Sequence, residues 1–500
     1  MKKKRVIILC LALVLIAGAV GGFLAWRDQQ KRDMLAAVTE YSAVLEPGEL
    51  DSLEQYPNLR LADLSGSSCY DEMDAWANAH PGVELRYTLP LGGSECLNSA
   101  GQLELREGAY EPEALLAALP HLRALESLTL PETERSPEQL EALAQAAPQA
   151  QLRWSRSILG GEYWDDTESL DLGGVPAGTL EQELSQLQLL PALKRVELVA
   201  ADGASPYSME QALAVRQALP EAEVHYVFTL FGQTVDSGEE SLIYENVPIG
   251  REGLDQIRLA LALMPNCTYL KLADCGIDND TMTALRDEYA GRVKVVWQVY
   301  LDRYGFPTDV EVIHLAFESP RKPIRDDNSH ILNYCTDLVY LDLGHNTLTN
   351  IEFCRYMPKL KNLILSYNSV ADLSPLSACP ELEFVELKCT QVSDLTPLTA
   401  CTKLRLLNVT ATNVHDVTPV QEIKNLERFY CVWNTVPQEQ KAELAVALPD
   451  CWITYQMDDG FNVGWSYDER GVRAAWYLEI YRIYRYRVLD WYFGPIEDPA

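Results

Sequence analysis

Positively charged residues are scarce in this chain of 500 residues. Lysine and arginine number 41 against 73 aspartates and glutamates, which gives a net charge of −32 at pH 7. We expect no nucleic-acid partner, because a protein that binds nucleic acid neutralises phosphates with a basic surface. A strongly acidic exterior also keeps an exported protein soluble and away from anionic surfaces.

The sequence also lacks the motifs of catalytic and metal sites. No Cys-x-x-Cys or Cys-x-x-His spacing is present to suggest zinc. The seven histidines are scattered singly, without a nucleophile elbow, a metal-binding helix motif or a phosphate loop beside them. We therefore predict no enzyme activity, no metal and no cofactor. An unrecognised cell-wall-active enzyme that uses paired carboxylates is the least favoured alternative.

One long uncharged run stands near the beginning of the chain. Residues 1–5 carry four positive charges, and residues 6–26 carry none. This length suffices to cross a bilayer as a helix. Because the basic end stays in the cytoplasm, we predict a single-pass anchor at 6–26 with the bulk of the chain extracellular. The alternative is a signal segment that is cleaved near Ala19, which yields a secreted protein.

A 22-residue repeat fills the region from Leu338 to Asn434. Each copy has apolar residues at its first, fourth and sixth positions and Asn or Thr at its ninth. The copies are Leu338-x-x-Leu341-x-Leu343-x-x-Asn346, Leu360-x-x-Leu363-x-Leu365-x-x-Asn368, Leu382-x-x-Val385-x-Leu387-x-x-Thr390, Leu404-x-x-Leu407-x-Val409-x-x-Thr412 and Leu426-x-x-Phe429-x-Cys431-x-x-Asn434. Such a coil must stack on its neighbours to bury its apolar face. We expect the Asn or Thr to hydrogen-bond loop backbone that is otherwise buried unpaired.

The second half of the unit repeats as well. Val370-x-Asp372-Leu373-x-Pro375-Leu376 recurs at Val392 and Val414, which predicts that Asp372, Asp394 and Asp416 form turns rather than a weak cation site. With both halves in view, the segment resembles the repeats of internalin-type and related surface proteins of Gram-positive bacteria. The resemblance implies an α/β fold, namely a leucine-rich repeat solenoid with a curved parallel sheet and with helices and irregular turns on its convex side. It implies no particular ligand.

A diverged form of the repeat extends toward the N-terminus. Strand signals at Leu85, Leu152, Val224 and Val295 recur at steps of about 70 residues, as duplicated modules would. Each is followed at one constant, short spacing by another strand signal, and these lie at Leu103, Leu170, Leu242 and Ile313. Helices are predicted at 137–147, 209–219 and 280–289.

The short spacing between these paired strand signals has two interpretations. It fits either a minimal coil in a continuous parallel sheet, which we favour, or a hairpin. The hairpins would turn near Gly92, Gly160, Gly232 and Gly305.

These patterns predict six regions along the chain. The C-terminal region is dense in aromatic residues and arginines, and we favour a cap for the solenoid over contact with a partner or envelope surface. The regions are a cytoplasmic stub (1–5), a transmembrane anchor (6–26), a helical stalk (27–57), diverged modules of about 70 residues (58–330), regular repeats (331–457) and an aromatic cap helix (458–500).

The cysteines follow the repeat register. Cys335, Cys379 and Cys401 share one position with Met357 and Ile423, so we expect them to fill the core as thiols. Three others have no register role, and the sequence leaves open whether they form disulfides. These are Cys69, Cys96 and Cys389.

Side chains between the inward leucines are predicted to face the concave side. Aromatic residues there are not needed for the fold, and binding interfaces favour them as anchors. The candidate binding residues are Tyr340, His345, Ile364, Tyr367, Phe384, Glu386, Asn408, Tyr430 and Trp433, with Asp342 and Leu406 in the same column. The alternative is that the chain's own residues 465–493 cover this column.

The resulting hypothesis is a membrane-anchored leucine-rich repeat protein that recognises a protein or glycan at a bacterial cell surface without catalysis. A structural envelope spacer without a specific ligand is the alternative. The sequence determines neither the ligand nor the oligomeric state.

Overall fold

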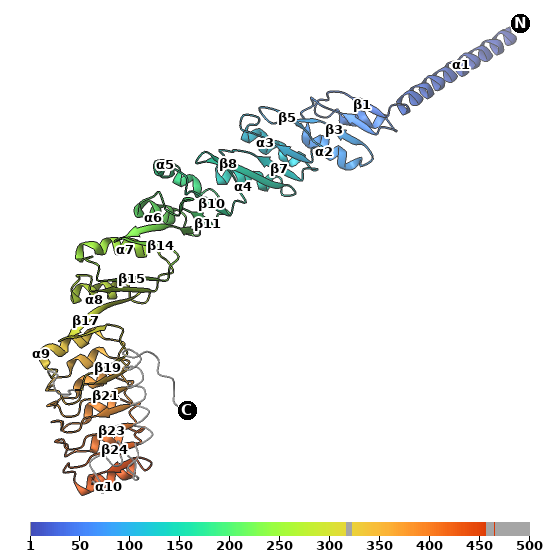
Figure 1. The fold of residues 1–500 in the computed structure, drawn as a ribbon. Coiled ribbons are helices and arrows are strands. Elements are labelled where there is room, and N and C mark those ends of the chain that lie inside the picture. The colour runs from blue at the N-terminus through green and yellow to red at the C-terminus, as the bar shows by residue number, and fades with distance from the viewer. Residues whose placement is uncertain (1, 317–322, 457–464, 466–500) are drawn as a thin grey trace, which may run out of the picture. The chain divides into compact units, whose positions relative to one another are not determined.

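The computed structural model describes residues 2–316, 323–456 and 465, with side chains from residue 19 onward. It divides into an N-terminal unit, Met1–Phe228, and a C-terminal unit, Thr229–Ala500 (Figure 1). The predicted aromatic cap helix (458–500) lies outside the described residues except for Trp465.

The chain begins with helix α1 (Lys2–Ala36). The side chains of residues 1–18, which make up most of the predicted anchor, lie outside the described part. Within the described part, no helix combines the length and the apolar character needed to span a bilayer. Strand β1 (Glu40–Ser42) already pairs with β2 (Leu61–Asp63), so the first sheet begins upstream of residue 58.

The N-terminal unit consists of three modules, each with three parallel strands. An inward-facing apolar residue stands at the centre of each strand, and a core that extends from Leu45 to Trp154 fills the first two modules. The strands are β1, β2 and β3 (Glu84–Arg86); β6 (Gln102–Glu104), β7 (Ser127–Leu130) and β8 (Gln151–Ile158); and β10 (Ser169–Asp171), β11 (Arg195–Glu197) and β12 (Glu223–His225). The connecting helices are η1 (Leu50–Gln55), α2 (Tyr70–Ala79), α3 (Pro112–Ala118), η2 (Leu119–His121), α4 (Pro137–Ala146), α5 (Ala177–Leu187) and α6 (Met209–Ala218).

Local capping chemistry explains where three helices start. Ser136 and Gln139 form a reciprocal capping box at α4, with Pro137 as the first helical residue. Ser208 forms the equivalent box at α6. In the C-terminal unit, Asp278 accepts a hydrogen bond from the Thr281 amide at 2.9 Å and caps α8 (Asn279–Glu288). The three helices predicted from the sequence are confirmed to within one position at each end.

Hairpins follow the modules, and the prediction of minimal parallel coils is wrong. The second half of β8 pairs antiparallel with β9 (Gly161–Trp164), and β17 (Lys294–Leu301) pairs antiparallel with β18 (Tyr304–Pro307). At Leu159-Gly160 both residues have positive φ, 52° and 76°, as a tight type I′ turn requires. The strand after each hairpin starts a new parallel sheet. The other two hairpins are β4 (Thr88–Pro90) with β5 (Glu95–Leu97), and β13 (Val227–Leu230) with β14 (Gln233–Asp236).

The C-terminal unit contains one further module and then the regular repeats. The module has β15 (Ser241–Glu245), β16 (Tyr269–Ala273) and β17, with η3 (Arg251–Gly253), α7 (Leu254–Leu263) and α8. Seven parallel strands follow: β19 (Val312–His314), β20 (Tyr340–Asp342), β21 (Asn362–Ile364), β22 (Phe384–Glu386), β23 (Leu406–Asn408), β24 (Arg428–Tyr430) and β25 (Trp452–Thr454). The other side carries α9 (Asp326–Ser329), η4 (His330–Tyr334), η5 (Glu352–Tyr356), η6 (Ser374–Ala378), η7 (Thr396–Ala400), η8 (Thr418–Glu422) and α10 (Gln438–Ala447).

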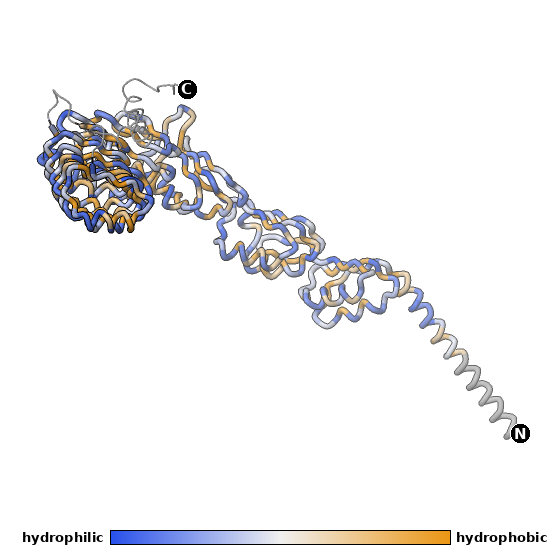
Figure 2. Tube along the Cα trace, turned by 90° about the horizontal axis from the view of Figure 1, so that it is seen from below, coloured by the Kyte–Doolittle hydropathy of each residue, from blue (hydrophilic) through white to orange (hydrophobic). Residues whose placement is uncertain are grey.

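The register of the seven-stranded sheet follows the 22-residue step. Leu341 pairs with Leu363, Leu363 with Val385 and Val385 with Leu407, and all four side chains are fully buried. The hydropathy view shows hydrophobic and hydrophilic segments interleaved through the repeats (Figure 2). On the other side, the Asp394 carboxylate accepts the Thr396 amide at 2.8 Å, which starts the 3-10 turn of η7. Asp372 and Asp416 do the same in their repeats, so the predicted turn role is confirmed.

The thiols of the repeats fill the core as expected. Cys335, Cys379 and Cys401 are fully buried beside the same layer as Met357 and Ile423. Burial raises the pKa of Cys379 to about 12 and that of Cys401 to about 11, which suppresses thiolate formation at neutral pH. The eleven described cysteines, which include Cys69, Cys96 and Cys389, are free thiols.

Buried asparagines connect successive coils. The Asn368 amide nitrogen donates to the carbonyls of Leu343 and Leu365 at 2.9 Å each, and its oxygen accepts the Leu348 amide at 3.0 Å. Asn346 makes the equivalent bonds one coil earlier. Each asparagine therefore satisfies backbone groups that water does not reach, as the repeat pattern predicts.

We expect Asn368→Ala to lower the free energy of unfolding by about 2 to 4 kcal/mol, because it leaves several buried backbone groups unpaired. The matched control is Asn413→Ala, since Asn413 is exposed and donates a single bond of 3.3 Å to Gln391. Urea titration of both variants measures the difference. Equal, small effects would show that the asparagine bonds do not hold the coils.

Candidate functional site

The predicted concave column divides into a buried part and an exposed part. Tyr340, Phe384, Glu386, Asn408 and Tyr430 are each no more than 5% exposed, and Ile364 is half-buried. Asp342 and Leu406 of the same column are also buried. Three of the predicted residues are exposed, namely His345, Tyr367 and Trp433.

Trp465 contacts three of these buried residues. Its ring centroid lies 5.3 Å from that of Phe384 and 6.1 Å from that of Tyr430, and its indole N–H donates to Glu386 Oε2 at 2.5 Å. The side chain is fully buried. It completes a hydrophobic group that we call the concave cluster: Tyr340, Phe384, Leu406, Tyr430, Val432 and Trp465.

The expectation of a solvent-facing column is therefore wrong for the buried residues. Trp465 comes from the C-terminal aromatic region, so its position supports the alternative in which the chain covers its own concave side. The physical reason is that a row of aromatic and aliphatic side chains is stabilised by burial against another aromatic side chain.

Polar side chains lie buried beside this cluster. Glu386 Oε1 accepts a hydrogen bond from the Ser366 hydroxyl at 2.8 Å. On the next strand, Asn408 Oδ1 accepts the Thr410 amide at 3.0 Å. Within the described residues, Asn408 Nδ2 and Thr410 Oγ1 have no hydrogen-bond partner, although both residues are at most 2% exposed. Buried polar groups without partners are uncommon and point to an unfilled interaction.

The exposed residues follow the carboxyl ends of the strands. They belong to a row that recurs at 22-residue steps and that we call the aromatic edge: His345, Tyr367, Cys389, Ala411 and Trp433. All five have positive φ, between 55° and 61°. The amide of each of the first four donates to a carbonyl of the next coil, for example Tyr367 to Lys388 at 2.7 Å.

The aromatic edge presents large rings where small residues fit best. The ring of His345 stacks on that of Tyr367, with centroids 4.2 Å apart and an interplanar angle of 15°. Glycine or asparagine relieves the left-handed conformation at such positions, so His, Tyr and Trp there carry a conformational cost of about 1 kcal/mol each. Partial burial and the neighbouring Cys389 thiol raise the pKa of Tyr367 above its ordinary value.

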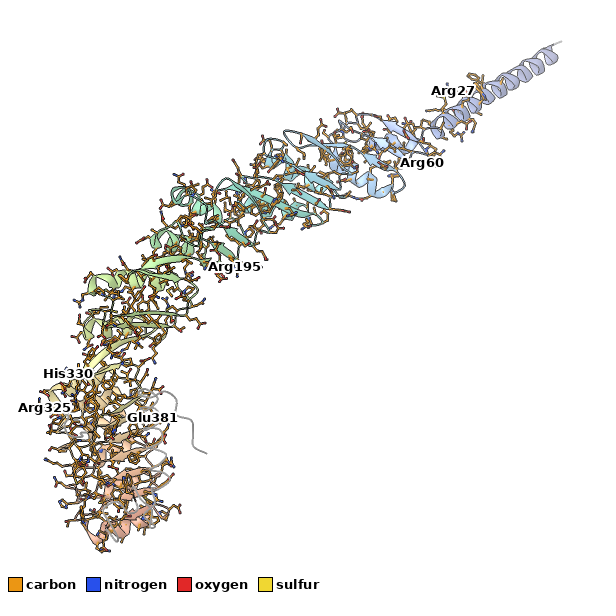
Figure 3. All side chains as sticks on the ribbon, in the orientation of Figure 1. Arg27, Arg60, Arg195, Arg325, His330 and Glu381 are labelled. Carbon is orange, nitrogen blue, oxygen red and sulfur yellow. The ribbon has the colours of Figure 1, made fainter. Side chains whose placement is uncertain are left out.

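The amino ends of the strands form a charged edge with alternating signs. Its residues recur at 22-residue steps: Asp337, Lys359, Glu381 and Lys403. Lys359 lies 2.5 Å from Asp337, and Lys403 lies 2.6 Å from Glu381, which Figure 3 labels. Asp337 is half-buried, while both lysines are exposed, and pairs near the surface contribute at most about 1 kcal/mol each. The two charges of each pair neutralise one another.

A cavity of about 420 Å³ lies next to the charged edge, lined among others by Lys294, Asp309, Asp337 and Lys359. Lys294 contacts Asp337 at 2.6 Å. Burial on its own raises the pKa of Asp337, but the hydrogen bonds from both lysines lower it overall. Lys294, Asp309, Asp337 and Lys359 are thus paired with each other. Among the residues whose placement is described, no group of three His, Cys, Asp or Glu could hold a metal ion.

Sequence comparison agrees with the geometry of the repeats. Residues 358–400 match the family model described as leucine-rich repeats in two copies. The chain contains leucine-rich repeats. No curated protein matches the sequence.

Solved leucine-rich repeat structures are similar to this chain at low identity. An internalin C2 of Listeria monocytogenes shows 18% identity over 30% of this chain and 75% of its own, with a TM-score of 0.25. Another internalin of Listeria monocytogenes, InlF, shows 13% identity over 85% of this chain and 84% of its own, with a TM-score of 0.24. A leucine-rich repeat protein of Leptospira interrogans shows 14% identity over 85% of this chain and 98% of its own, with a TM-score of 0.26. Likeness at this level carries no argument about the ligand.

Two features of the repeats cannot be predicted from the spacing of the leucines alone. The alternation of charge along Asp337, Lys359, Glu381 and Lys403 is visible in the sequence once the 22-residue frame is known. The contact between Trp465 and Glu386 joins residues 79 positions apart, and only the aromatic density of the C-terminal region hints at it.

Proposed function

We propose that the protein is a non-catalytic recognition protein that binds a protein partner through the aromatic edge of its leucine-rich repeats. The observation that carries the proposal is the exposed stack of His345 on Tyr367, with the exposed Trp433 further along the same row. Exposed aromatic residues are typical anchors of protein interfaces because they bury a large area with few rotatable bonds.

The contrast between the two edges supports this choice. At the charged edge, neighbouring lysines and carboxylates pair with one another and gain little from a partner. At the aromatic edge, Tyr367 is 37% exposed and Trp433 is 56% exposed, so apolar ring surface remains to be buried. Burial of such surface is the main driving force of association. A glycan that stacks on the same rings is the second candidate ligand.

We further propose that residues 6–26 anchor the chain in the cell membrane of a bacterium, with the repeats outside the cell. The support is the uncharged run that follows the basic N-terminus. We expect the protein to stay with membranes after alkaline extraction and to be released by detergent. Release into the medium as a shorter chain would instead support cleavage near Ala19.

The combined variant His345→Ala, Tyr367→Ala and Trp433→Ala tests the binding proposal. We expect its free energy of unfolding to change by no more than about 1 kcal/mol, because the three side chains are exposed. Crosslinking in native membranes captures the partners, and mass spectrometry identifies them. We expect the triple variant to bind such a partner about 30-fold or more weakly than the wild type does, because it has lost anchor residues. Interferometry with the purified partner measures the affinities of the wild type and of the triple variant.

Tyr356→Ala is the matched control, since Tyr356 is 52% exposed and belongs to η5 on the other side of the repeats. It should bind like the wild type. An unchanged affinity of the triple variant would contradict the assignment of the aromatic edge. If neither the wild type nor any variant retains a partner, the protein is better explained as a structural spacer.

A further inference from the structure

The concave cluster receives its central side chain from outside the repeats. Trp465 follows the last strand residue, Thr454, by eleven positions, which span up to about 36 Å when extended. The three strand spacings from β25 back to β22 amount to only about 14 Å. The number of residues between Thr454 and Trp465 therefore suffices for the same molecule to supply Trp465, and the repeats themselves form the rest of the cluster.

The repeats surround the Trp465 side chain with contacts of a specific chemistry. Phe384 and Tyr430 contact the indole, while Glu386 accepts its N–H. The other oxygen of Glu386 is already occupied by the Ser366 hydroxyl. Since Glu386 is 5% exposed, the oxygen that faces Trp465 depends on a donor from outside the repeats. Aromatic walls with a buried carboxylate favour an aromatic side chain that bears N–H or O–H, such as tryptophan or tyrosine, over phenylalanine.

A second observation is that polar groups next to Glu386 stay unpaired while Trp465 is in place. Asn408 is the strand neighbour of Glu386, and Thr410 follows it on the same face. In the closed arrangement, the Asn408 Nδ2 donor and the Thr410 Oγ1 atom remain without partners among the described residues. A peptide backbone offers a carbonyl oxygen to Asn408 Nδ2 and either an N–H or a carbonyl to Thr410 Oγ1. The internal occupant therefore leaves polar groups unsatisfied that an incoming extended peptide could pair.

We propose that the concave cluster is a binding site for an extended peptide that presents tryptophan or tyrosine, and that Trp465 is its tethered competitor. This surface is distinct from the aromatic edge, so the inference does not depend on the proposed function. A tethered side chain competes at a high effective concentration, and an external peptide binds well only when the tether's anchor is removed or displaced.

The test uses the full chain and a fluorescein-labelled peptide with the sequence of residues 461–466, which contains the tryptophan but ends before Tyr467. We expect Trp465→Ala to bind this peptide about tenfold or more tightly than the wild type does, measured by fluorescence polarisation. A peptide with alanine in place of the tryptophan should not bind, and one with phenylalanine should bind more weakly because it lacks the N–H. Adding Glu386→Gln to Trp465→Ala should weaken binding of the tryptophan peptide several-fold.

Trp452→Ala is the matched control, because Trp452 is 49% exposed on β25 and donates its N–H to Thr454. It should bind the peptide no better than the wild type. The triple variant of the aromatic edge, combined with Trp465→Ala, should bind the peptide as Trp465→Ala alone does, which separates this inference from the proposed function.

Folded Trp465→Ala protein that binds no peptide would overturn the proposal, as would equal binding of the tryptophan and alanine peptides. If Trp465→Ala does not fold, Trp465→Phe keeps an aromatic ring, although a smaller one, and removes the indole donor. This variant should then bind the tryptophan peptide more tightly than the wild type. Binding equal to the wild type would overturn the proposal in that case.

Discussion

The hydrogen bonds of buried asparagines are the interaction on which the repeats depend. Each coil turns its backbone into the interior, where carbonyls and amides have no access to water. Asn346 and Asn368 each supply both a donor and an acceptor, and they bond to their own coil and to the preceding one. Thr390 at the same position of the next repeat donates within its own coil. The leucines drive stacking without direction, whereas these amides add directional bonds between successive coils, which advance by a constant 22-residue step. The regular sheet follows from both.

That fixed advance also determines where functional side chains lie. The residue three positions before each strand lies at the charged edge, and the strand itself lines the concave side. The residue with positive φ that follows the strand belongs to the aromatic edge. A single repeat frame therefore yields three columns of different chemistry: paired charges at Lys359 and Lys403, buried aromatics at Phe384 and Tyr430, and exposed rings at Tyr367 and Trp433. The upstream modules do not share this continuity, because each parallel sheet gives way to a hairpin before the next begins.

The sequence predicts the features that depend on local spacing. The strands around Leu341, Leu363 and Leu407, the capped helices and the buried thiols all follow from registers or short motifs. The hairpins do not, because the short spacing between paired strand signals accommodates either a coil or two short antiparallel strands. Leu159-Gly160 also lacks the Asn-Gly signature of a tight hairpin turn.

For the candidate site, the sequence identifies the columns but not their exposure. Whether Phe384 and Tyr430 meet solvent depends on Trp465, whose contact is long-range and has no periodic signal. The left-handed conformation of Tyr367 and Trp433 is also set by the coil, since neither residue favours it alone. The burial of the concave column therefore depends on the assembled repeats together with Trp465, which follows them in the sequence.

The central claim is that the chain covers its own concave column and leaves the aromatic edge open. Hydroxyl-radical footprinting of the native protein, read residue by residue by mass spectrometry, measures this directly. The account predicts rapid oxidation of His345, Tyr367 and Trp433 and strong protection of Phe384, Tyr430 and Trp465. Oxidation of Phe384, Tyr430 and Trp465 as fast as that of Tyr367 would contradict it.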